Sequence, residues 1–349
     1  CYKIKKKKNH YINEELFFLL TTSGSTGSSK LVRLSYKNIE SNTKSIVKFL
    51  NIKSSDKLIT TLPPDYTYGF SQLNTHLYKS STIILNDYSI IQRDFWELLC
   101  KTQATTFGGV PYTYELLKKI KFENYNLSSL KYITQAGGKL SKENQKYFYN
   151  ILKKKKIKLI IMYGATEATS RMSYLPWSKC KNKIGSIGIP IPGSKMEIIK
   201  PNNKKIGEIL FKGSNVSLGY ANSLKDLKRG DLNNGKLYTG DLGFRDNQGY
   251  YFIIGRKKRF LKIVGHRISL DELEIQLRNF LKYKSIYCTG TDNELVVLVR
   301  KKQIKNNLLN CLLKEYKINK NLIKIKFFNK IILTSSGKIN YEALNENSI

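Results

Sequence analysis

The segment TTSGSTGSSK at residues 21–30 combines residue types that bind phosphate groups. Glycines let backbone N–H groups turn toward an anion, the Ser and Thr hydroxyls add donors, and Lys30 adds a positive charge. The segment differs from the P-loop pattern G-x-x-x-x-G-K-[ST], because Gly24 and Gly27 are three residues apart and Ser29 precedes the lysine. Taken alone, the pattern is also typical of an ordinary surface loop.

A second segment, MYGATEATS at residues 162–170, follows an apolar run of strand length. An aromatic ring, a tight glycine turn, a hydroxyl and a carboxylate at the C-terminal end of a strand suit a nucleotide site. Tyr163 is then a candidate to stack on a base, Thr166 to donate to a phosphate and Glu167 to hold Mg²⁺. The same residues also fit a purely structural interpretation, in which Tyr163 covers the core and Glu167 is solvated.

Two further candidates lie in the C-terminal half of the sequence. Asp241 lies in a Gly-flanked turn and is a candidate acceptor for a ribose diol, and Arg256 follows a predicted strand. Near the C-terminus, TSSGKI places Lys338 on a predicted loop. A turn aspartate, a surface arginine and an exposed lysine are also ordinary features of a chain with 61 Lys and Arg residues.

The elements that must position these residues alternate along the first part of the chain. Apolar runs of strand length are separated by helical patterns, which predicts an α/β layered domain with a mainly parallel sheet. We assign this part to residues 1–194. The predicted strands are residues 16–20, 58–61, 82–85 and 159–162, and the predicted helices are residues 41–50, 112–119 and 141–152.

The pattern changes after residue 194. Residues 195–255 contain short apolar runs joined by Gly and Asn turns, and we predict a β-rich subdomain that completes the large domain. Residues 256–349 are predicted to form a small, mobile α+β domain. The fold class is therefore α/β, with a large layered domain and a small C-terminal one.

The small domain has local signals of its own. Ser269 and Glu272 form a capping-box pair that opens an amphipathic helix running to Leu281. The later predicted elements are a hairpin at residues 286–299 with its turn near residues 292–293, a helix near residues 308–316 and a strand at residues 325–333.

The composition excludes several classes of protein. A hydrophobic fraction of 41% over 349 residues is globular and indicates about two domains. No apolar run approaches the roughly 20 residues of a transmembrane helix. The five cysteines are scattered without a C-x-x-C pair, and the three histidines do not cluster. Neither a disulfide framework nor a zinc site is predicted, and we expect a cytoplasmic protein.

The net charge of +35 favours an anionic partner, such as a nucleotide, an acidic protein or a nucleic acid. Lysine far outnumbers arginine, and Lys, Asn, Ile and Tyr are abundant together, as an AT-rich genome would produce. Nucleic-acid-binding proteins use arginine for bidentate contacts to bases and phosphates. We therefore expect no nucleic-acid partner, and a basic nucleic-acid-binding protein is the alternative from another class.

Taken together and in order, these segments resemble the adenylate-forming (AMP-binding) superfamily of acyl-CoA synthetases, luciferases and adenylation domains. The first loop resembles that family's TSGTTGxPKG, with Ser29 where proline is usual. YGATE resembles its YGxTE, YTGDL its YxTGD, GRKKRFLKIVGHRISLDELE its GRxxxxIKxxGxRIxxxEIE, and SGKIN its terminal GK loop. AGGKL at residues 136–140 resembles the strip that lines the adenine, and IGEILFKGSNVSLGY at residues 206–220 resembles GEIxxxGxxxxxGY. The resemblance covers the chain from Leu16 onward.

The resemblance implies a nucleotide site. Asp241 and Arg256 would hold the ribose hydroxyls, Thr166 would contact the α-phosphate, and Glu167 would bind the magnesium ion. The adenine would lie between a glycine backbone and an aromatic ring, formed by Gly137, Gly138, Tyr163 and Gly164. The triphosphate would be bound by Thr22, Ser23, Gly24, Ser25, Thr26, Gly27 and Lys30.

The resemblance also implies a two-step reaction. A substrate carboxylate attacks the α-phosphorus of ATP and expels pyrophosphate, and a thiol of coenzyme A or of carrier-protein phosphopantetheine then attacks the acyl-adenylate. Because two anions must meet in the first step, Lys30, Lys338 and the magnesium ion are suited to stabilise its transition state. Family members rotate the small domain between the steps. Lys258 matches the hinge position, and Lys262 and Gly265 match the face used in the thiol step.

The N-terminus departs from the family pattern. Only about 20 residues precede the phosphate loop, where the family carries a long segment, and residue 1 is Cys1. We therefore expect a fragment, or a gene shortened at its 5′ end. An inactive truncated relative is the first alternative to an active enzyme.

The predicted acid pocket also departs from the family pattern. In DYTYGFSQLNTH at residues 65–76, Tyr66 replaces the histidine that is common in acyl-CoA synthetases. Gly69 stands where amino-acid-activating members carry the aspartate that holds the substrate's amine. A buried ammonium without a partner is costly, so we expect a fatty, aryl or hydroxy acid rather than an α-amino acid. Asp65 is a possible substitute for that aspartate, and His76 faces either the pocket or the core.

The sequence thus predicts an ATP-dependent acid–thiol ligase. Its substrate is a small carboxylic acid, its cofactors are ATP, Mg²⁺ and coenzyme A or phosphopantetheine, and an acidic acyl carrier protein is one of two possible acceptors. The positive charge suits both acceptors, because coenzyme A carries phosphates and carrier proteins are typically acidic.

Overall fold

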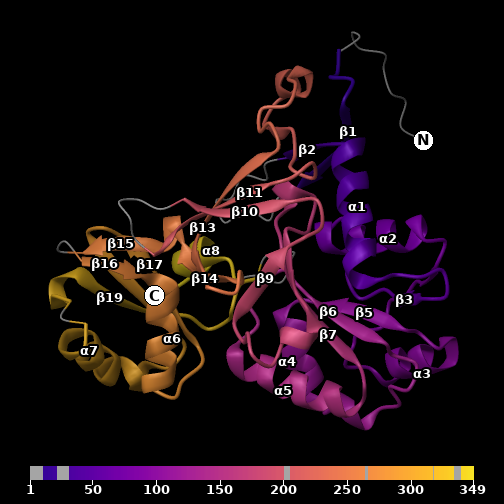
Figure 1. Cartoon of the computed structure of the whole chain (residues 1–349). Coiled ribbons are helices and arrows are strands. Elements are labelled where there is room, and N and C mark those ends of the chain that lie inside the picture. Colours follow the sequence, from indigo (N-terminus) through magenta and orange to yellow (C-terminus); the bar gives the residue numbers. More distant parts are fainter. Residues whose placement is uncertain (1–10, 22–30, 200–204, 264–265, 317, 334–338) are drawn as a thin grey trace, which may run out of the picture.

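The computed structural model describes residues 11–349 except residues 22–30, 200–204, 264–265, 317 and 334–338. It shows a large α/β body built on one extended sheet and a smaller α+β unit at the C-terminal end of the chain (Figure 1). The predicted α/β class is found.

The large sheet has 11 strands in the order β10-β11-β13-β14-β9-β8-β7-β6-β5-β3-β4. Its first half is parallel and consists of β3 (Lys57–Ile59), β4 (Thr82–Ile84), β5 (Thr106–Gly109), β6 (Tyr132–Gln135) and β7 (Lys158–Tyr163). Its second half is antiparallel and consists of β8 (Ser173–Leu175), β9 (Ser186–Pro190), β10 (Lys195–Ile199), β11 (Gly207–Lys212), β13 (Lys236–Arg245) and β14 (Tyr251–Arg256). After residue 194, the strands β10, β11, β13 and β14 thus continue the parallel sheet.

Helices cover both faces of the parallel half (Figure 1). Because side chains alternate along a strand, Ile161 packs with α3, α4 and α5 on one face, whereas Ile160 and Met162 lie on the opposite face, toward α1 and α2. The helices are α1 (Tyr36–Leu50), α2 (Thr67–Tyr78), α3 (Arg93–Thr102), α4 (Pro111–Lys119) and α5 (Lys142–Lys154). The largest buried cluster joins Phe95 and Trp96 of α3 to Phe148 of α5.

Helix α1 begins earlier than the predicted residue 41. The Ser35 hydroxyl accepts from the Asn38 backbone N–H at 3.1 Å, and the Asn38 side chain accepts from the Ser35 N–H at 2.9 Å. This reciprocal cap fixes the first turn. The sequence prediction missed it because the turn is polar and its N3 residue is asparagine rather than Glu or Gln.

A small sheet of three strands, β1 (Leu16–Thr21), β2 (Leu31–Ser35) and β12 (Gly219–Ala221), holds the base of the predicted phosphate loop. Thr21 of β1 pairs with Leu31 of β2, which closes the hairpin around residues 22–30. On its other side, Leu31 pairs with Ala221 of β12.

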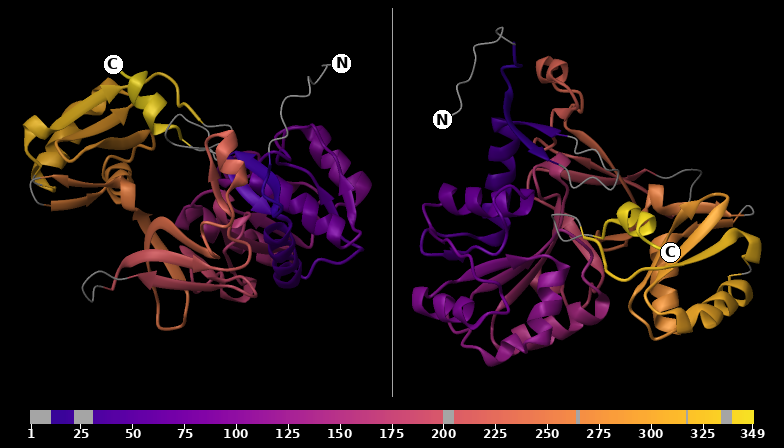
Figure 2. Two further views of the ribbon diagram at one scale, coloured as in Figure 1. Left: turned by 90° about the horizontal axis from the view of Figure 1, so that it is seen from above. Right: turned by 180° about the vertical axis from the view of Figure 1, so that it is seen from behind.

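The C-terminal unit lies beside the antiparallel half of the large sheet, near β13 and β14 (Figures 1 and 2). It contains β15 (Phe260–Ile263), β16 (His266–Ser269), α6 (Leu270–Phe280), β17 (Ile286–Thr291), β18 (Glu294–Val299), α7 (Lys305–Lys314), β19 (Ile323–Phe327) and α8 (Tyr341–Glu346). Short 3₁₀ helices occur in both units. They are η1 (Phe122–Asn124), η2 (Thr166–Ala168), η3 (Trp177–Lys179) and η4 (Leu224–Lys228) in the large body, and η5 (Lys257–Arg259), η6 (Lys302–Ile304) and η7 (Lys320–Leu322) at the C-terminal end.

One local prediction for this unit is confirmed, one is found in part and one is wrong. The hairpin turn falls at residues 292–293. Of the predicted capping box, the described residues form one half, in which the Ser269 hydroxyl accepts from the Glu272 N–H at 3.3 Å. The predicted strand at residues 325–333 instead ends at Phe327. Its parallel partner β18 ends at Val299, which is paired with Phe327, so the apolar residues beyond have no strand to extend.

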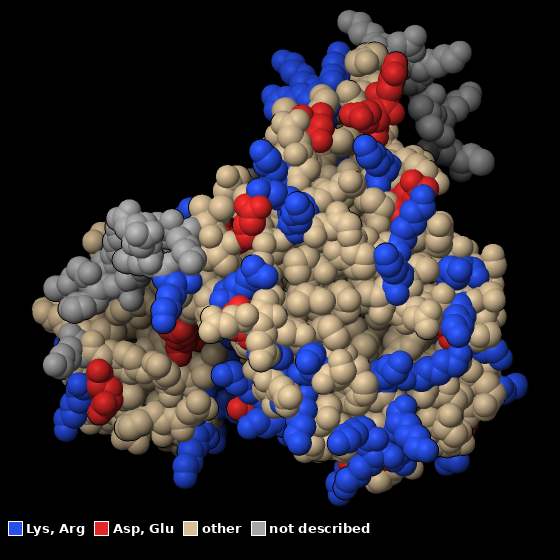
Figure 3. Space-filling model, viewed as in Figure 1, with Lys and Arg blue, Asp and Glu red and all other residues tan. Residues whose placement is uncertain are grey.

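Basic side chains are spread over the face shown in Figure 3, with fewer acidic ones among them. In the described part of the chain, no helix has the length and apolar character needed to cross a bilayer.

Candidate functional site

The predicted adenine-binding residues lie at one edge of the sheet. Strands β6 and β7 are parallel neighbours with Gln135 opposite Ile161, and Tyr163 is the last residue of β7. Gly137 and Gly138 follow the end of β6, so the glycine backbone and the tyrosine ring lie at the carboxyl ends of adjacent strands. The carboxyl edge of parallel strands is where open α/β sheets bind ligands.

Both glycines have a conformational or steric reason to be glycine. Gly137 has a positive φ of 81°, and a Cβ built there would lie 2.4 Å from the Tyr66 hydroxyl. A Cβ on Gly138 would lie 3.0 Å from Cγ of Pro111. The Tyr66 hydroxyl and the Pro111 ring already occupy the space that a Cβ would need, so glycine lets these neighbouring side chains pack against the strip.

The turn after β7 folds back on itself. A Cβ on Gly164 would lie 1.6 Å from the carbonyl oxygen of Ser170, so only glycine fits this approach. Thr169 and Ser170 both have positive φ, at 53° and 106°. Strained backbone of this kind persists where the surrounding structure holds it in place. The close approach fixes Thr166 and Glu167 at the sheet edge.

Asp241 joins two other predicted nucleotide-binding residues. Its Oδ2 accepts from the Tyr163 hydroxyl at 2.5 Å, and its Oδ1 accepts from Nε of Arg256 at 3.1 Å. Asp241 and Arg256 are cross-strand partners in β13 and β14, which explains why residues 15 apart in sequence meet. The backbone N–H of Asp241 donates to the Thr239 hydroxyl at 3.1 Å. The predicted Gly-flanked turn is wrong: Asp241 lies inside β13, because pairing with β14 keeps this segment in the sheet.

The protonation states of these partners follow from their surroundings. The Asp241 carboxylate raises the pKa of Arg256 above its usual value, so the guanidinium stays charged. Burial, with the same carboxylate, raises the pKa of Tyr163 well above its usual value. Tyr163 therefore remains a neutral donor, and the carboxylate is held between one hydroxyl and one cation.

Thr166 and Glu167 have partners that the sequence prediction missed. The Thr166 hydroxyl lies 2.9 Å from the Thr67 hydroxyl of α2, and Oε1 of Glu167 accepts from the Tyr220 hydroxyl at 2.7 Å. Tyr220 lies on β12, whose neighbour β2 begins where the predicted phosphate loop ends. The signal for Tyr220 was present in the segment ending SLGY, but periodicity alone did not link it to Glu167.

Glu167 is the candidate magnesium ligand. Mg²⁺ is commonly held by one or two carboxylates together with substrate phosphates rather than by a complete protein cage. Among the described residues there is no cluster of three or more His, Cys, Asp and Glu side chains that would form such a cage. Glu167, at the sheet edge beside the predicted phosphate site, fits the first kind of site.

Several predicted site residues lie outside the described residues and stay predictions. They are the phosphate-loop residues Thr22 to Lys30, Gly265 and Lys338, together with the side chains of Lys258 and Lys262.

The predicted acid pocket is described in part. A Cβ on Gly69 would lie 2.1 Å from the carbonyl oxygen of Pro63, so this backbone has no room for an aspartate at that position. Asp65, the possible substitute, is exposed. His76 is buried at 3% exposure and lines a small cavity; whether it faces the acid pocket stays a prediction.

Comparisons with known proteins place the chain in a family. Residues 4–221, more than half of the chain, match the family described as AMP-binding enzyme. The "Probable 4-coumarate--CoA ligase 2" of Dictyostelium discoideum is 33% identical over 283 residues, which is 77% of this chain and 50% of that protein. The "Long-chain-fatty-acid--CoA ligase" of Bacillus subtilis is 29% identical over 287 residues, 79% of this chain and 50% of that protein. The chain thus spans about half the length of these relatives.

Solved structures share the fold at lower identity. O-succinylbenzoate coenzyme A synthetase from Bacillus subtilis, in complex with ATP and magnesium ion, superposes with a TM-score of 0.76 at 22% identity, covering 94% of this chain and 69% of that one. A structure of "McyG A-PCP complexed with phenylalanyl-adenylate" gives a TM-score of 0.73 at 22% identity, covering 99% of this chain and 60% of that one. From its sequence match and its fold, the chain belongs to the AMP-binding enzyme family.

Proposed function

We propose that this protein is an ATP-dependent, AMP-forming acid–thiol ligase. It would activate a small carboxylic acid as an acyl-adenylate and transfer the acyl group to a thiol of coenzyme A or of carrier-protein phosphopantetheine. The observation that carries the proposal is the group formed by Tyr163, Asp241 and Arg256, which lies beside Glu167 in the order that the family pattern implies.

The chemistry of this group suits a nucleotide. The Asp241 carboxylate pairs with Arg256 and can accept from the vicinal hydroxyls of a ribose. The Tyr163 ring at the sheet edge offers a stacking surface for adenine while its hydroxyl stays bonded to Asp241. ATP is therefore held by its sugar and base, which orients its α-phosphorus toward Thr166.

The first step needs positive charge where the two anions meet. Thr166, whose hydroxyl is positioned by Thr67, would donate to the α-phosphate, and Glu167 would hold a magnesium ion, which supplies charge stabilisation when bound. Lys30 and Lys338 would add cations to the pentavalent transition state. Pyrophosphate leaves, and the acyl-adenylate is then open to attack by a thiolate, which releases AMP.

The acid is unlike an α-amino acid. Gly69 packs against the Pro63 carbonyl, and Asp65 points to solvent, so neither would pair with a substrate ammonium. An unpaired buried ammonium would be strongly disfavoured. This supports a carboxylic acid without an α-amino group.

Exchange of labelled pyrophosphate into ATP tests the proposal, because it requires only the first step. We expect exchange that depends on a carboxylic acid and on Mg²⁺. Lys338→Ala should slow exchange by a factor on the order of a hundred or more while ATP affinity is retained, since its charge acts on the transition state. Lys330→Ala, which removes an exposed lysine eight residues earlier, is the matched control and should exchange at the parent rate. ATP binding without any acid-dependent exchange would contradict the proposal.

A further inference from the structure

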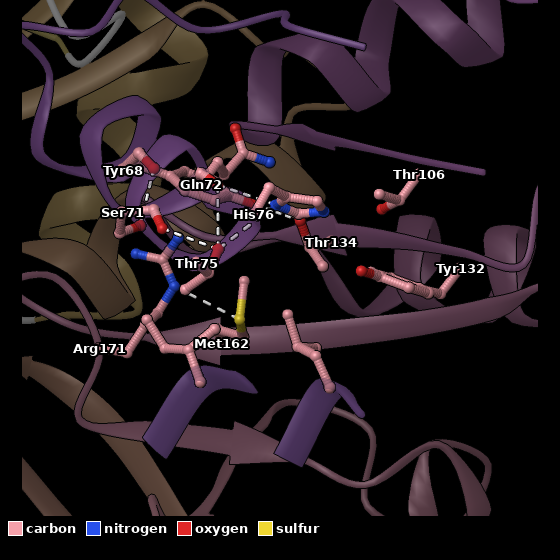
Figure 4. Close-up of a pocket in the computed structure, with 12 residues that line it drawn as sticks. Tyr68, Ser71, Gln72, Thr75, His76, Thr106, Tyr132, Thr134, Met162 and Arg171 are labelled. Atoms are coloured by element: carbon pink, nitrogen blue, oxygen red, sulfur yellow. Dashed lines mark hydrogen bonds between the residues drawn. The ribbon is translucent and has the colours of Figure 1, made fainter. Parts of the chain in front are cut away.

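Helix α2 and the turn after β7 enclose a buried cation. Arg171 is only 3% exposed, and its guanidinium carbon lies 3.9 Å from the centre of the Tyr68 ring (Figure 4). Its Nε approaches Sδ of Met162 at 3.3 Å, and its Nη1 donates to the hydroxyl and the carbonyl oxygen of Ser170. All of these partners are neutral.

The chain offers Arg171 no counter-ion. None of the ion pairs among the described residues involves it. The stretches outside the described residues contain no Asp or Glu, so they hold no further side-chain carboxylate. Burial raises the pKa of Tyr68 to about 12, so its hydroxyl stays neutral. A buried charge without a partner costs a large free energy, which indicates that the anion comes from a ligand.

Arg171 lines a cavity of about 10 Å³ between α1, α2 and the parallel strands (Figure 4). A second buried group in its wall also lacks a partner. His76 Nδ1 lies 2.8 Å from the carbonyl oxygen of Gln72, so Nδ1 carries the proton and Nε2 is an acceptor without a donor among the described residues. The volume is near the lower limit for one water molecule, and a water here can bridge Nε2 and the Tyr132 hydroxyl, which also has no hydrogen-bond partner among the described residues. The remaining polar wall comes from Ser71, Gln72, Thr75, Thr106, Tyr132 and Thr134.

The cavity is close to the predicted site of acyl activation. Ser71 of α2 lies with its hydroxyl 3.1 Å from that of Ser170, beside Arg171. One helical turn earlier, Thr67 contacts Thr166. Four residues of an α-helix rise about 6 Å. An acid whose reacting carboxylate lies at Thr166 and which extends along α2 over that distance therefore ends at Arg171.

We propose that Arg171 binds a second carboxylate of the substrate, so that the acid activated by this chain is a short dicarboxylic acid. The inference rests on the proposed ligase function and narrows its substrate class. An apolar fatty tail or an unsubstituted aryl ring would leave the buried guanidinium without a counter-ion.

The test compares short diacids with monoacids of equal chain length. Pyrophosphate exchange is measured with malonate, succinate and glutarate, and with propionate, butyrate and valerate, at constant ionic strength. We expect at least one diacid to exceed its monoacid partner in kcat/KM by about thirtyfold or more, and Arg171→Met to remove that preference. Arg245→Gln, which alters an exposed arginine near the Tyr251 ring, is the control and should keep it. A parent enzyme that prefers the monoacids overturns the inference while leaving the ligase function intact.

Failure of exchange with every acid would contradict the ligase function itself. In that case a binding measurement still tests whether Arg171 binds a second carboxylate. The preferred diacid should raise the midpoint of thermal unfolding of the parent and of Arg245→Gln but not of Arg171→Met. Because the buried charge is unpaired in the free protein, Arg171→Met should be at least as stable as the parent without ligand. A destabilised Arg171→Met together with no diacid-dependent shift in the parent would show a purely structural arginine and overturn the inference.

Discussion

Asp241 is the residue on which the proposed nucleotide site most directly depends. Its two carboxylate oxygens accept from different donors, Tyr163 and Arg256, which orients the group. The YTGDL pattern singled out Asp241 only together with the other motifs in their order, because an aspartate beside glycines is by itself an ordinary feature. The hydrogen bond from Tyr163 depends on the approach of β13 to the edge of β7 and was not predictable from either segment.

Asp241→Ala should weaken ATP affinity by about tenfold or more, since hydrogen bonds to a charged group typically contribute about 1.5–3 kcal/mol. ATP titration followed by calorimetry measures this directly. Asp87→Ala removes an exposed aspartate and serves as the control. Equal ATP affinity for Asp241→Ala and the parent would remove Asp241 from the nucleotide site.

At the scale of elements, the turn between β7 and β8 determines where Thr166, Glu167 and Arg171 lie. The strand β7 was predicted from its apolar run, and the functional residues were expected at its end. The sharp return of the chain at Ser170 was not predicted, because it depends on a contact between the Gly164 backbone and residues six and seven positions later.

Gly164→Ala should destabilise the protein by about 3 kcal/mol or more, because the added methyl group would overlap the Ser170 carbonyl and force the strained turn to open. Denaturant unfolding measures the loss. Gly193→Ala is an informative comparison: that glycine also has a positive φ, 82°, but a Cβ added there would meet no atom within 4 Å, so only backbone strain applies. Equal losses for the two variants would contradict the role assigned to the close approach.

Helix α2 carries a group that couples stability to pH. Burial lowers the pKa of His76 below its ordinary value near 6.5, against the opposing effects of the Gln72 carbonyl and Asp56. As pH falls below that value, the unfolded chain takes up a proton that the folded protein does not, so the folded state loses stability. His76→Gln should reduce this acid-dependent loss by up to about 1.4 kcal/mol per pH unit. Chemical denaturation between about pH 5 and 7 covers this window, and identical pH profiles would show that His76 titrates alike in both states.

The whole molecule carries a net charge of +35, and the basic side chains are distributed widely rather than confined to one stripe on the face in Figure 3. Such a charge repels itself in the compact state. The same surface leaves both proposed thiol acceptors open, because each brings negative charge.

Added salt should therefore stabilise the protein. Raising NaCl from about 10 mM to about 100 mM shortens the Debye length from about 30 Å to about 10 Å and screens the repulsion. We expect the midpoint of thermal unfolding to rise over this range, and an uncharged osmolyte at equal osmolality serves as the comparison. A midpoint that falls with salt would mean that the surface ion pairs outweigh the net repulsion.

The fold class followed from alternating apolar runs and helical patterns, and the hairpin at residues 286–299 followed from two β-branched runs around an Asp-Asn turn. The C-terminal end of β19 could not be predicted from the sequence pattern, because the length of a strand is limited by the strand with which it pairs. Helix α1 began earlier than expected because its cap uses Ser35 and Asn38. Whether a segment forms a strand or a helix followed from its local sequence. Where several of these elements begin or end depended on the residues and strands that contact them.

The sequence by itself determined which residues belong to a nucleotide-binding pattern and in which order, because glycines, hydroxyls and charges at fixed spacing are local requirements of phosphate and ribose binding. Only the tertiary structure decided which of those groups meet. It paired Asp241 with Tyr163, Glu167 with Tyr220 and Thr166 with Thr67, contacts that join segments 53 to 99 residues apart. It also buried Arg171 without a counter-ion beside a cavity. The physical reason is that the free energy of a charge depends on the groups packed around it, and long-range packing alone determines those groups.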